Sequence, residues 1–328
     1  MSLLISGATV APVPVADPKI AAQNAAVAAA AALWVGLRPT WTGFDGSVWR
    51  LTDLSGGVVL TRGGVRGMSM PPVVRFTPVV SPALHGTRNR GFRVNERDVF
   101  WPLYINHPTS SAGFIARDAA FWATMRPDQT GVWSITAPDG TTRSLTCRFM
   151  DDGNKAFDML PSITGWTTYG VTLVAEAPFW LGTPVVRTFQ AVNPLTPPPY
   201  PTSASSPPYV LYLSAGQTLQ AATARNAGDV EAWPVWRLSG PFTSASVGVG
   251  AAQVVVPFVV AAGRYVTLNS DPASFTATMD DGTDVTNLLG QSGWASVPPG
   301  GEASLNLSIV GGAGSVSVTL TPRFLRAW

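Results

Sequence analysis

The chain has 328 residues, of which 46% are hydrophobic and 12% are charged, and its mean hydropathy is +0.20. Soluble proteins usually carry roughly 25% charged residues, so a lone monomer of this composition would have few charges to prevent self-association. A net charge of +2 gives no general attraction to nucleic acid. The single cysteine, Cys147, excludes an internal disulfide and a thiolate metal cluster. The length suggests two domains, and the apolar excess indicates burial in a membrane or against other chains.

Residues 1–40 are predicted to form an N-terminal arm with a short Ala-rich helix. The longest weakly polar run spans residues 20–37, but most of its bulk is alanine and it includes Gln23 and Asn24. A membrane-spanning helix needs about 20 strongly apolar residues, so no membrane insertion is expected. No basic residue precedes Lys19, so a secretory signal peptide is not expected either. Burial in a larger assembly is the remaining explanation for the composition.

Residues 41–190 are predicted to form a barrel-like β domain with one amphipathic helix. Ser110 and Ser111 precede a helical stripe that ends before Pro127, and the stripe consists of Phe114, Ile115, Phe121, Trp122 and Met125. Alternating apolar residues then flank a Pro-Asp-Gly turn at 138–140, which is typical of a β-hairpin. A further half-buried strand is indicated at 169–173. We expect the stripe and the inward strand faces to form one core.

A proline-rich segment, residues 191–208, is predicted to be an extended linker because proline fits neither a helix interior nor a central strand. After it, residues 209–328 show strand alternation and no helical periodicity. Leu305, Leu307 and Ile309 alternate with polar residues, glycines at 311–314 reverse the chain, and the alternation repeats at 316–320. This pattern predicts a C-terminal β-sandwich or jelly roll.

Few residues in the chain suit catalysis or metal binding. The two histidines, His85 and His107, show no zinc-site spacing, and no serine lies in a nucleophile elbow. Two acidic clusters occur, one at Asp151 and Asp152, and one formed by Asp280, Asp281 and Asp284 around Gly282. Carboxylates at such positions can bind calcium or serve hydrolysis, but Asp-Gly is also common hairpin-turn chemistry. We favour turns, and we expect no enzyme activity, cofactor or metal.

A stretch from residue 62 to residue 97 is rich in arginine and contains almost no acid. Its arginines are Arg62, Arg66, Arg75, Arg88, Arg90, Arg93 and Arg97. A nucleic-acid patch or a solvated basic face would account for them. Arginine is also favoured at protein–protein contacts, because its planar fork pairs bidentately with carboxylates. We favour a subunit or partner interface that includes Arg62, Arg66, Arg88, Arg90, Arg93 and Arg97.

Several motifs, in order along the chain, resemble the distal tail protein family of long-tailed (siphovirus) bacteriophages. The signature residues are Asn226, Gly228, Asp229 and Pro234, followed by the pair Gly240 and Pro241. Supporting motifs occur at residues 138–143, 176–180 and 292–300. The resemblance covers roughly residues 48 to 328, whereas the Ala-rich arm has no counterpart.

This resemblance implies a hexameric hub ring at the tail tip of a virion, assembled in the host cytoplasm. The N-terminal domains of such proteins encircle the channel, with the tail tube protein on one face and tail-associated, receptor-directed proteins on the other. The C-terminal domain projects outward and in some relatives is galectin-like, carrying side fibres or binding sugar. The resemblance implies no cofactor and no catalytic residue. A ring also gives each subunit two heterologous interfaces, which would bury the apolar excess.

Two further classes of function remain as alternatives. The first is a carbohydrate-binding protein that acts through the C-terminal sandwich and a host-surface glycan, with Trp233, Trp236, Trp294 and Tyr265 stacking on sugar rings. The same aromatic residues are also compatible with core or interface packing, which we favour. The second is a tail-associated hydrolase, which the scarcity of histidine and of spaced acidic pairs disfavours.

Overall fold

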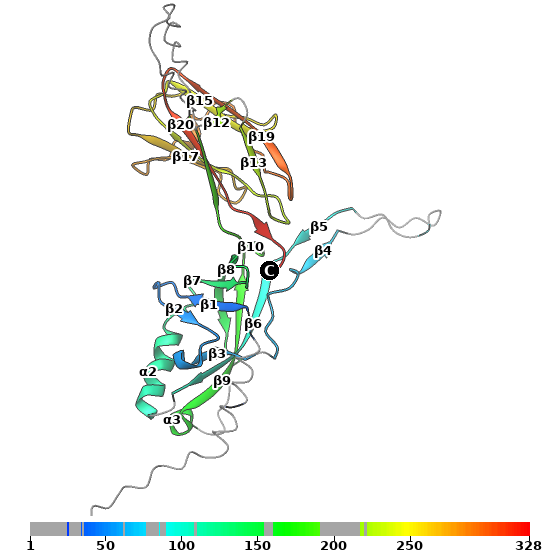
Figure 1. The fold of residues 1–328 in the computed structure, drawn as a ribbon, viewed down its shortest axis with the longest axis vertical. Coiled ribbons are helices and arrows are strands. Elements are labelled where there is room, and N and C mark those ends of the chain that lie inside the picture. Colours follow the sequence, from blue (N-terminus) through cyan, green and yellow to red (C-terminus); the bar gives the residue numbers. More distant parts are fainter. Residues whose placement is uncertain are drawn as a thin grey trace, which may run out of the picture. The chain divides into compact units, whose positions relative to one another are not determined.

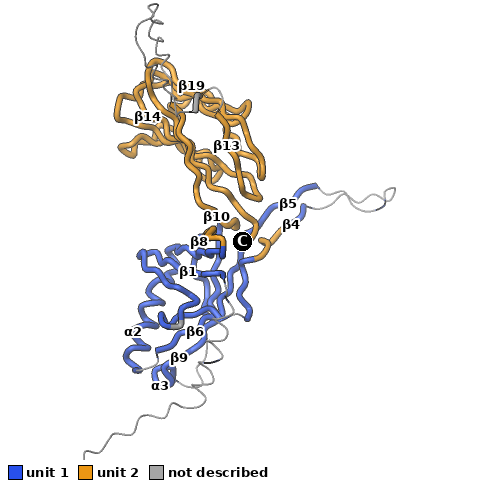
Figure 2. The backbone as a smooth tube through the Cα atoms, viewed as in Figure 1, with its two compact units in different colours: residues 1–68, 74–138, 146–177 blue, residues 69–73, 139–145, 178–328 orange. Residues whose placement is uncertain are grey.

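The computed structural model describes residues 25, 34, 36–61, 63–76, 85, 90–107, 110–153, 160–190, 217–219 and 222–328. The chain divides into two compact units, which Figure 2 shows in different colours. The first comprises residues 1–68, 74–138 and 146–177, and the second comprises residues 69–73, 139–145 and 178–328.

The first unit is built on a strongly curved antiparallel sheet (Figure 1). Its strands follow the order β2 (Val48–Arg50), β1 (Arg38–Thr42), β7 (Thr130–Thr136), β8 (Thr142–Asp151), β9 (Trp166–Ala175), β6 (Arg97–Asn106) and β3 (Val58–Leu60). Leu51, the residue after β2, joins the two ends of this order, because its N–H donates to the Pro39 carbonyl in β1 and its own carbonyl accepts from the Leu60 N–H in β3. The predicted barrel-like, mainly β domain is therefore confirmed.

Alternation along the strands places one face of this sheet in the core. Trp101 lies between Trp41 and Trp133, with edge-to-face contacts of 5.3 Å between ring centroids on each side. Such T-shaped pairs add about 0.5–1.5 kcal/mol each beyond the area that the rings bury. Phe149 and Tyr169 extend the aromatic packing toward the helix through Trp122.

The predicted amphipathic helix is α2 (Ser111–Trp122). It begins where predicted because Ser110 is extended and its side chain accepts a hydrogen bond from the Gly113 N–H at 2.9 Å, as an N-cap does. Phe114 and Phe121 of the predicted stripe are buried, but Ile115 is 55% exposed. A second helix, α3 (Pro161–Thr164), and the 3₁₀ turn η1 (Leu54–Gly56) complete the unit.

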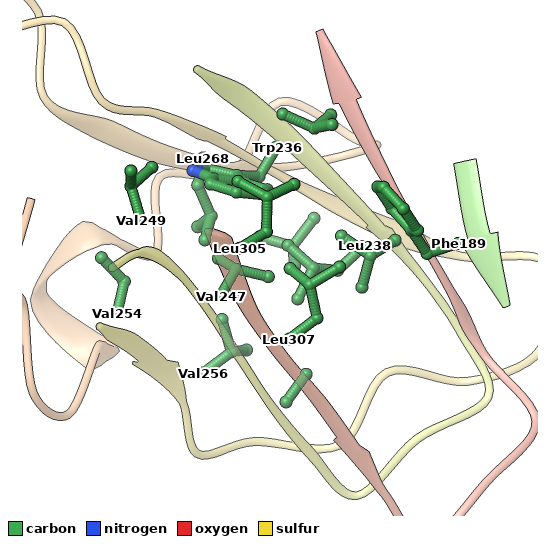
Figure 3. Packing of buried hydrophobic residues seen from close by; sticks show 14 of the residues in the cluster. Phe189, Trp236, Leu238, Val247, Val249, Val254, Val256, Leu268, Leu305 and Leu307 are labelled. Carbon is green, nitrogen blue, oxygen red and sulfur yellow. The ribbon is translucent and has the colours of Figure 1, made fainter. Parts of the chain in front are cut away.

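The second unit contains a sandwich of two antiparallel-rich sheets around a common core. The six-stranded sheet has the order β12 (Gln217–Thr218), β11 (Val185–Gln190), β20 (Ser315–Leu320), β14 (Val235–Ser239), β17 (Tyr265–Asn269) and β18 (Thr276–Met279). The four-stranded sheet has the order β13 (Thr223–Arg225), β19 (Glu302–Val310), β15 (Ser244–Val249) and β16 (Val254–Val256). Figure 3 shows how Trp236 and Leu238 of one sheet pack against Val247, Leu305 and Leu307 of the other. A 3₁₀ turn, η3 (Thr286–Leu288), follows β18.

A short pair of strands closes this unit. Strand β10 (Trp180–Leu181) pairs with β21 (Arg323–Phe324) near the end of the chain, and Leu181 also pairs with Ser144 of the β7–β8 hairpin. Arg143 of the same hairpin lies 3.6 Å from the Phe324 ring centroid and donates to the Arg326 carbonyl at 2.9 Å. The hairpin tip therefore belongs to the second unit.

The domain ranges remain a prediction. The predicted linker 191–208 and almost all of the Ala-rich arm lie outside the described residues. Strand β11 falls within the range 41–190 but pairs with β20 in the sheet of the second unit. No helix within the described part of the chain is long and apolar enough to span a membrane.

Candidate functional site

A two-stranded ribbon exposes five of its six described strand residues. Strands β4 (Val73–Arg75) and β5 (Phe92–Val94) pair only with each other among the described strands (Figure 1). The large apolar side chains on or next to these strands are well exposed: Val73 48%, Val74 41%, Phe76 48% and Phe92 60%. A two-stranded ribbon by itself is marginally stable in water, and contiguous exposed apolar surface is typical of interaction sites.

The end of the ribbon is held by a close backbone contact. The Phe76 N–H donates to the Gly91 carbonyl at 3.0 Å. Gly91 has φ +118°, and a Cβ there would lie 3.1 Å from the Phe76 ring. Only glycine fits this conformation without strain, so the aromatic ring can approach the backbone at the residue that precedes β5.

The arginine-rich stretch lies partly on this ribbon. Arg75, Arg90 and Arg93 are exposed on or beside β4 and β5. Arg66 is also exposed, but it bridges to Phe100 through its backbone and places its guanidinium 5.0 Å from the Phe100 ring centroid. Arg62 and Arg88 lie outside the described residues. The structure thus gathers Arg90 and Arg93 with apolar side chains, which is the composition of an interface core and its rim.

Arg97 departs from the predicted interface because its side chain is inside the first unit, 1% exposed. It opens β6 on the inward side of the alternation that continues with Val99 and Trp101. The guanidinium donates from Nη1 to the Gly67 carbonyl at 2.8 Å, and burial lowers the pKa of Arg97 to about 10. Arg97 therefore anchors the turn at Gly67 in the core and does not contribute to a surface.

The signature residue Asn226 is fully buried and makes three hydrogen bonds. Its Nδ2 donates to the carbonyls of Val230 at 2.8 Å and Val297 at 3.1 Å. Its Oδ1 accepts from the Gly228 N–H at 2.9 Å. One side chain thereby closes the loop at 226–230 and ties it to the segment at Val297.

The neighbouring signature residues hold the last strand. Asp229 and Val230 follow Gly228, and the N–H groups of both donate to the Arg323 carbonyl in β21. The Asp229 carboxylate accepts from the Leu325 N–H at 3.2 Å. A Cβ on Gly228 would lie 2.5 Å from the Arg323 carbonyl oxygen, so only glycine permits this approach.

The Gly-Pro part of the signature has a similar structural role. The Gly240–Pro241 peptide is cis, and Gly240 packs against the carbonyls of Val260 and Ala261. Pro234 is buried at the start of β14, where its carbonyl accepts from the Ser270 N–H. The signature residues therefore position backbone segments within the second unit.

The acidic cluster near residue 280 forms turns and ion pairs. Arg264 donates to Asp280 and to Asp281, each at 2.7 Å. Hydrogen bonds from Thr283, together with Arg264, lower the pKa of Asp281 to about 2. Asp284 instead accepts from the backbone and hydroxyl of Thr286.

The other candidate chemical groups are similarly dispersed. The Asp151 carboxylate accepts from the Gly153 N–H at 3.1 Å, His85 is exposed, and the His107 ring packs against Gly113. Within the described ranges, no three His, Cys, Asp or Glu side chains form a group that could hold a metal ion.

Comparisons with known proteins find matches in structure but none in sequence. The sequence matches no protein-family profile and no curated protein. The Dit protein of phage SPP1, described as a paradigm of the hub adsorption apparatus in phages that infect Gram-positive bacteria, superposes with a TM-score of 0.58 at 13% identity. The match covers 88% of this chain and 99% of that protein. The chain has the fold of a phage tail hub protein.

Two structures of the phage P2 baseplate in its activated conformation, with Ca and with Sr, contain further matches to this hub fold. Each has a TM-score of 0.50, at 12% and 11% identity, and each covers 86% of this chain and 97% of the matched chain. The resemblance to the distal tail protein family is thereby confirmed at the level of the fold. At 86% coverage, these matches include residues of both units of this chain.

Within the hub fold, the four aromatic residues considered for sugar binding occupy different environments. Trp236 is buried in the sandwich core at 1% exposure, and Tyr265 lies under the guanidinium of Arg237 at 3.7 Å. Trp233 and Trp294 are half-buried and both contact Phe275, which sequence analysis did not single out. No local signal identifies Phe275, because the three rings come from segments far apart in the sequence.

Proposed function

We propose that this chain is a non-catalytic structural subunit of a bacteriophage tail tip. In this proposal it forms a ring, with six copies as the expected order, that joins the tail tube to receptor-directed tail-tip proteins of the virion. The observation that carries the proposal is the β4–β5 ribbon, whose apolar side chains are exposed on an element too small to be stable alone. The hub fold, shared with a phage hub protein and with baseplate chains, supports the same role.

The ribbon is suited to pairing with a neighbouring copy. Full burial of an aromatic or branched side chain such as Phe92 or Val74 contributes about 1.5–3 kcal/mol. Arg75, Arg90 and Arg93 lie among these side chains and would pair with carboxylates at the edge of the contact. A contact between the ribbon of one copy and a different surface of the next is heterologous, and such contacts generate a closed ring when the rotation between successive copies closes.

Low charge is the second support. Only 12% of residues are charged. The described residues bury a hydrophobic core in each unit and still leave many large apolar side chains exposed. The apolar excess is therefore available for subunit contacts along the ring and for axial contacts with the tube on one face and tip proteins on the other.

The test is the mass of the full chain in solution by size-exclusion chromatography with light scattering. Phe92→Asp places a charge on the ribbon and should shift the oligomer toward the 34.4 kDa monomer. Val259→Asp is the matched control, because Val259 is a comparably exposed apolar residue (70%) in the second unit. Equal masses for the two variants and the wild type would refute the ribbon as the assembly element.

A further inference from the structure

The outer face of the first unit's sheet carries an apolar patch that is shut off from water, on the adjacent strands β3, β6 and β9 (Figure 1). Val59 of β3 pairs with Tyr104 of β6, and both side chains are 0% exposed. Tyr104 points away from the core, because Trp101, three residues earlier on the same strand, points into it. Trp166 of β9 packs against this pair, with its ring centroid 5.9 Å from that of Tyr104. Val59, Tyr104 and Trp166 form an outer patch, and its burial requires a covering segment.

Two polar atoms lie beside the outer patch without a partner. Asn106 is two residues after Tyr104 and pairs with Trp166, so both side chains lie on the outer face. Asn106 Oδ1 and Trp166 Nε1 are buried, and neither has a hydrogen-bond partner among the described residues. Buried polar atoms in native proteins are nearly always hydrogen-bonded. The covering segment should therefore be apolar over the patch and should supply a donor and an acceptor next to it.

The N-terminal arm enters the described fold at this face. Trp34 donates from Nε1 to the Leu60 carbonyl in β3 at 3.3 Å. The Leu37 N–H donates to the Trp34 carbonyl at 3.1 Å, in the turn that leads into β1. Residues 1–33 precede Trp34, so the arm starts next to Val59 of the outer patch.

The sequence of the arm has the composition that this face requires. Residues 20–33 carry no charge and consist mostly of alanine, the strongest helix former, and Ala25 is helical and exposed. In a helix, spacing of i, i+3, i+4 and i+7 defines one stripe, which here consists of Ile20, Gln23, Asn24 and Val27. Ala25 falls on the opposite side of that helix. The stripe combines two apolar side chains with two amides, which supply both donors and acceptors.

The distances along the arm and across the sheet agree. Asn24 precedes Trp34 by ten residues, which is about 15 Å of helix. Asn106 lies one strand across from Leu60 and three positions along, and Trp166 lies one strand further. At about 3.4 Å per residue and 4.8 Å between strands, these two residues are about 11–14 Å from Leu60. The amides of the stripe therefore reach the two unpartnered atoms when Trp34 is held at Leu60.

We propose that residues 20–33 dock on the outer patch of their own chain. Val27 covers Val59 and Tyr104, and the two amides of the stripe hydrogen-bond to Asn106 and Trp166. The occupant is the chain's own arm, because a segment tethered at β3 has a high effective concentration at the patch. This inference goes beyond the ring proposal, because the outer patch and the β4–β5 ribbon share no residue.

Hydroxyl-radical footprinting of the full chain with mass spectrometry tests the docking, because the oxidation rate of a side chain reports its exposure. Val27→Asp places a charge on the stripe and should raise the oxidation rates of Tyr104 and Trp166 at least fivefold. Ala25→Asp is the matched control, because it places the same charge on the opposite side of the same helix, and it should change both rates less than twofold. Trp101, buried in the core, reports unfolding and should keep its rate in both variants.

Deletion of residues 1–33 separates the chain's own arm from that of a neighbouring copy. Tyr104 of the truncated chain should be oxidised at least fivefold faster, and it should remain so after mixing with an excess of isotopically labelled full-length chains. Protection of the truncated chain in that mixture would assign the patch to a neighbour's arm and overturn the proposal. Equal oxidation of Tyr104 in the full chain, in Val27→Asp and in the truncated chain would also overturn it. A monomeric mass in solution would refute the ring and leave the Tyr104 result unchanged, so the two proposals fail separately.

Discussion

Replacing Asn226 by alanine tests whether the signature cluster holds the sandwich together. The substitution removes three hydrogen bonds from a side chain with 0% exposure. The two hydrogen bonds that Nδ2 donates contribute about 1 kcal/mol net each, and leaving the buried Gly228 N–H without its acceptor costs ~1–3 kcal/mol. We therefore expect a loss of about 3–5 kcal/mol in the local free energy of opening.

Hydrogen exchange with mass spectrometry measures this loss directly, because a chain with two units need not unfold in a single step. Peptides covering 226–232 and 295–301 should exchange roughly a hundredfold to several thousandfold faster, since 1.4 kcal/mol corresponds to a factor of ten. Asn306→Ala is the control, because Asn306 is an exposed strand asparagine and should alter exchange little. A change below tenfold at Asn226→Ala would refute the reasoning.

Three further predictions follow from single sites. Gly228→Ala should destabilise the protein more than Gly282→Ala. A Cβ at 228 would meet backbone atoms at 2.5 Å, whereas a Cβ at 282, despite φ +86°, would meet open space. The melting temperatures of the two variants check this, and equal temperatures would contradict it. Burial raises the pKa of the Cys147 thiol, so it should react with a disulfide reagent at pH 8 only after denaturation; fast reaction of the native chain would disprove that burial. The pKa of Asp281 should be about 2 in the native chain by carbon NMR and should rise in Thr283→Val. Because the folded-state pKa is depressed, the stabilising effect of the ionised carboxylate is present above the ordinary value of 3.8 and is lost as pH falls toward 2. An unchanged pKa in the variant would exclude Thr283 as the cause.

Sequence patterns predicted the elements whose burial alternates. The helix from residue 111 was recognisable because Ser110 caps it and the stripe reaches Phe114 and Phe121. The hairpin now seen as β7 and β8 was predicted from its turn and from alternation that ends in Phe149. In both cases a single face meets the core, so the periodicity is visible in a single chain.

Other features could not be predicted, for identifiable physical reasons. Both faces of the β4–β5 ribbon are exposed, so β4 and β5 show no alternation. Arg97 occupies an inward position that pattern rules reserve for apolar residues. The cluster around Phe275 joins three loops through tertiary contacts alone. Strand β11 was placed in the range 41–190, because alternation within a strand does not identify its partner.

We expect this chain to assemble with copies of itself through the exposed ribbon. Native mass spectrometry of the purified full chain at increasing concentration tests it most directly. We predict a closed species of six copies of the 34.4 kDa chain, visible as six-fold rings by negative-stain imaging. A chain that remained monomeric and soluble at millimolar concentration would contradict the claim.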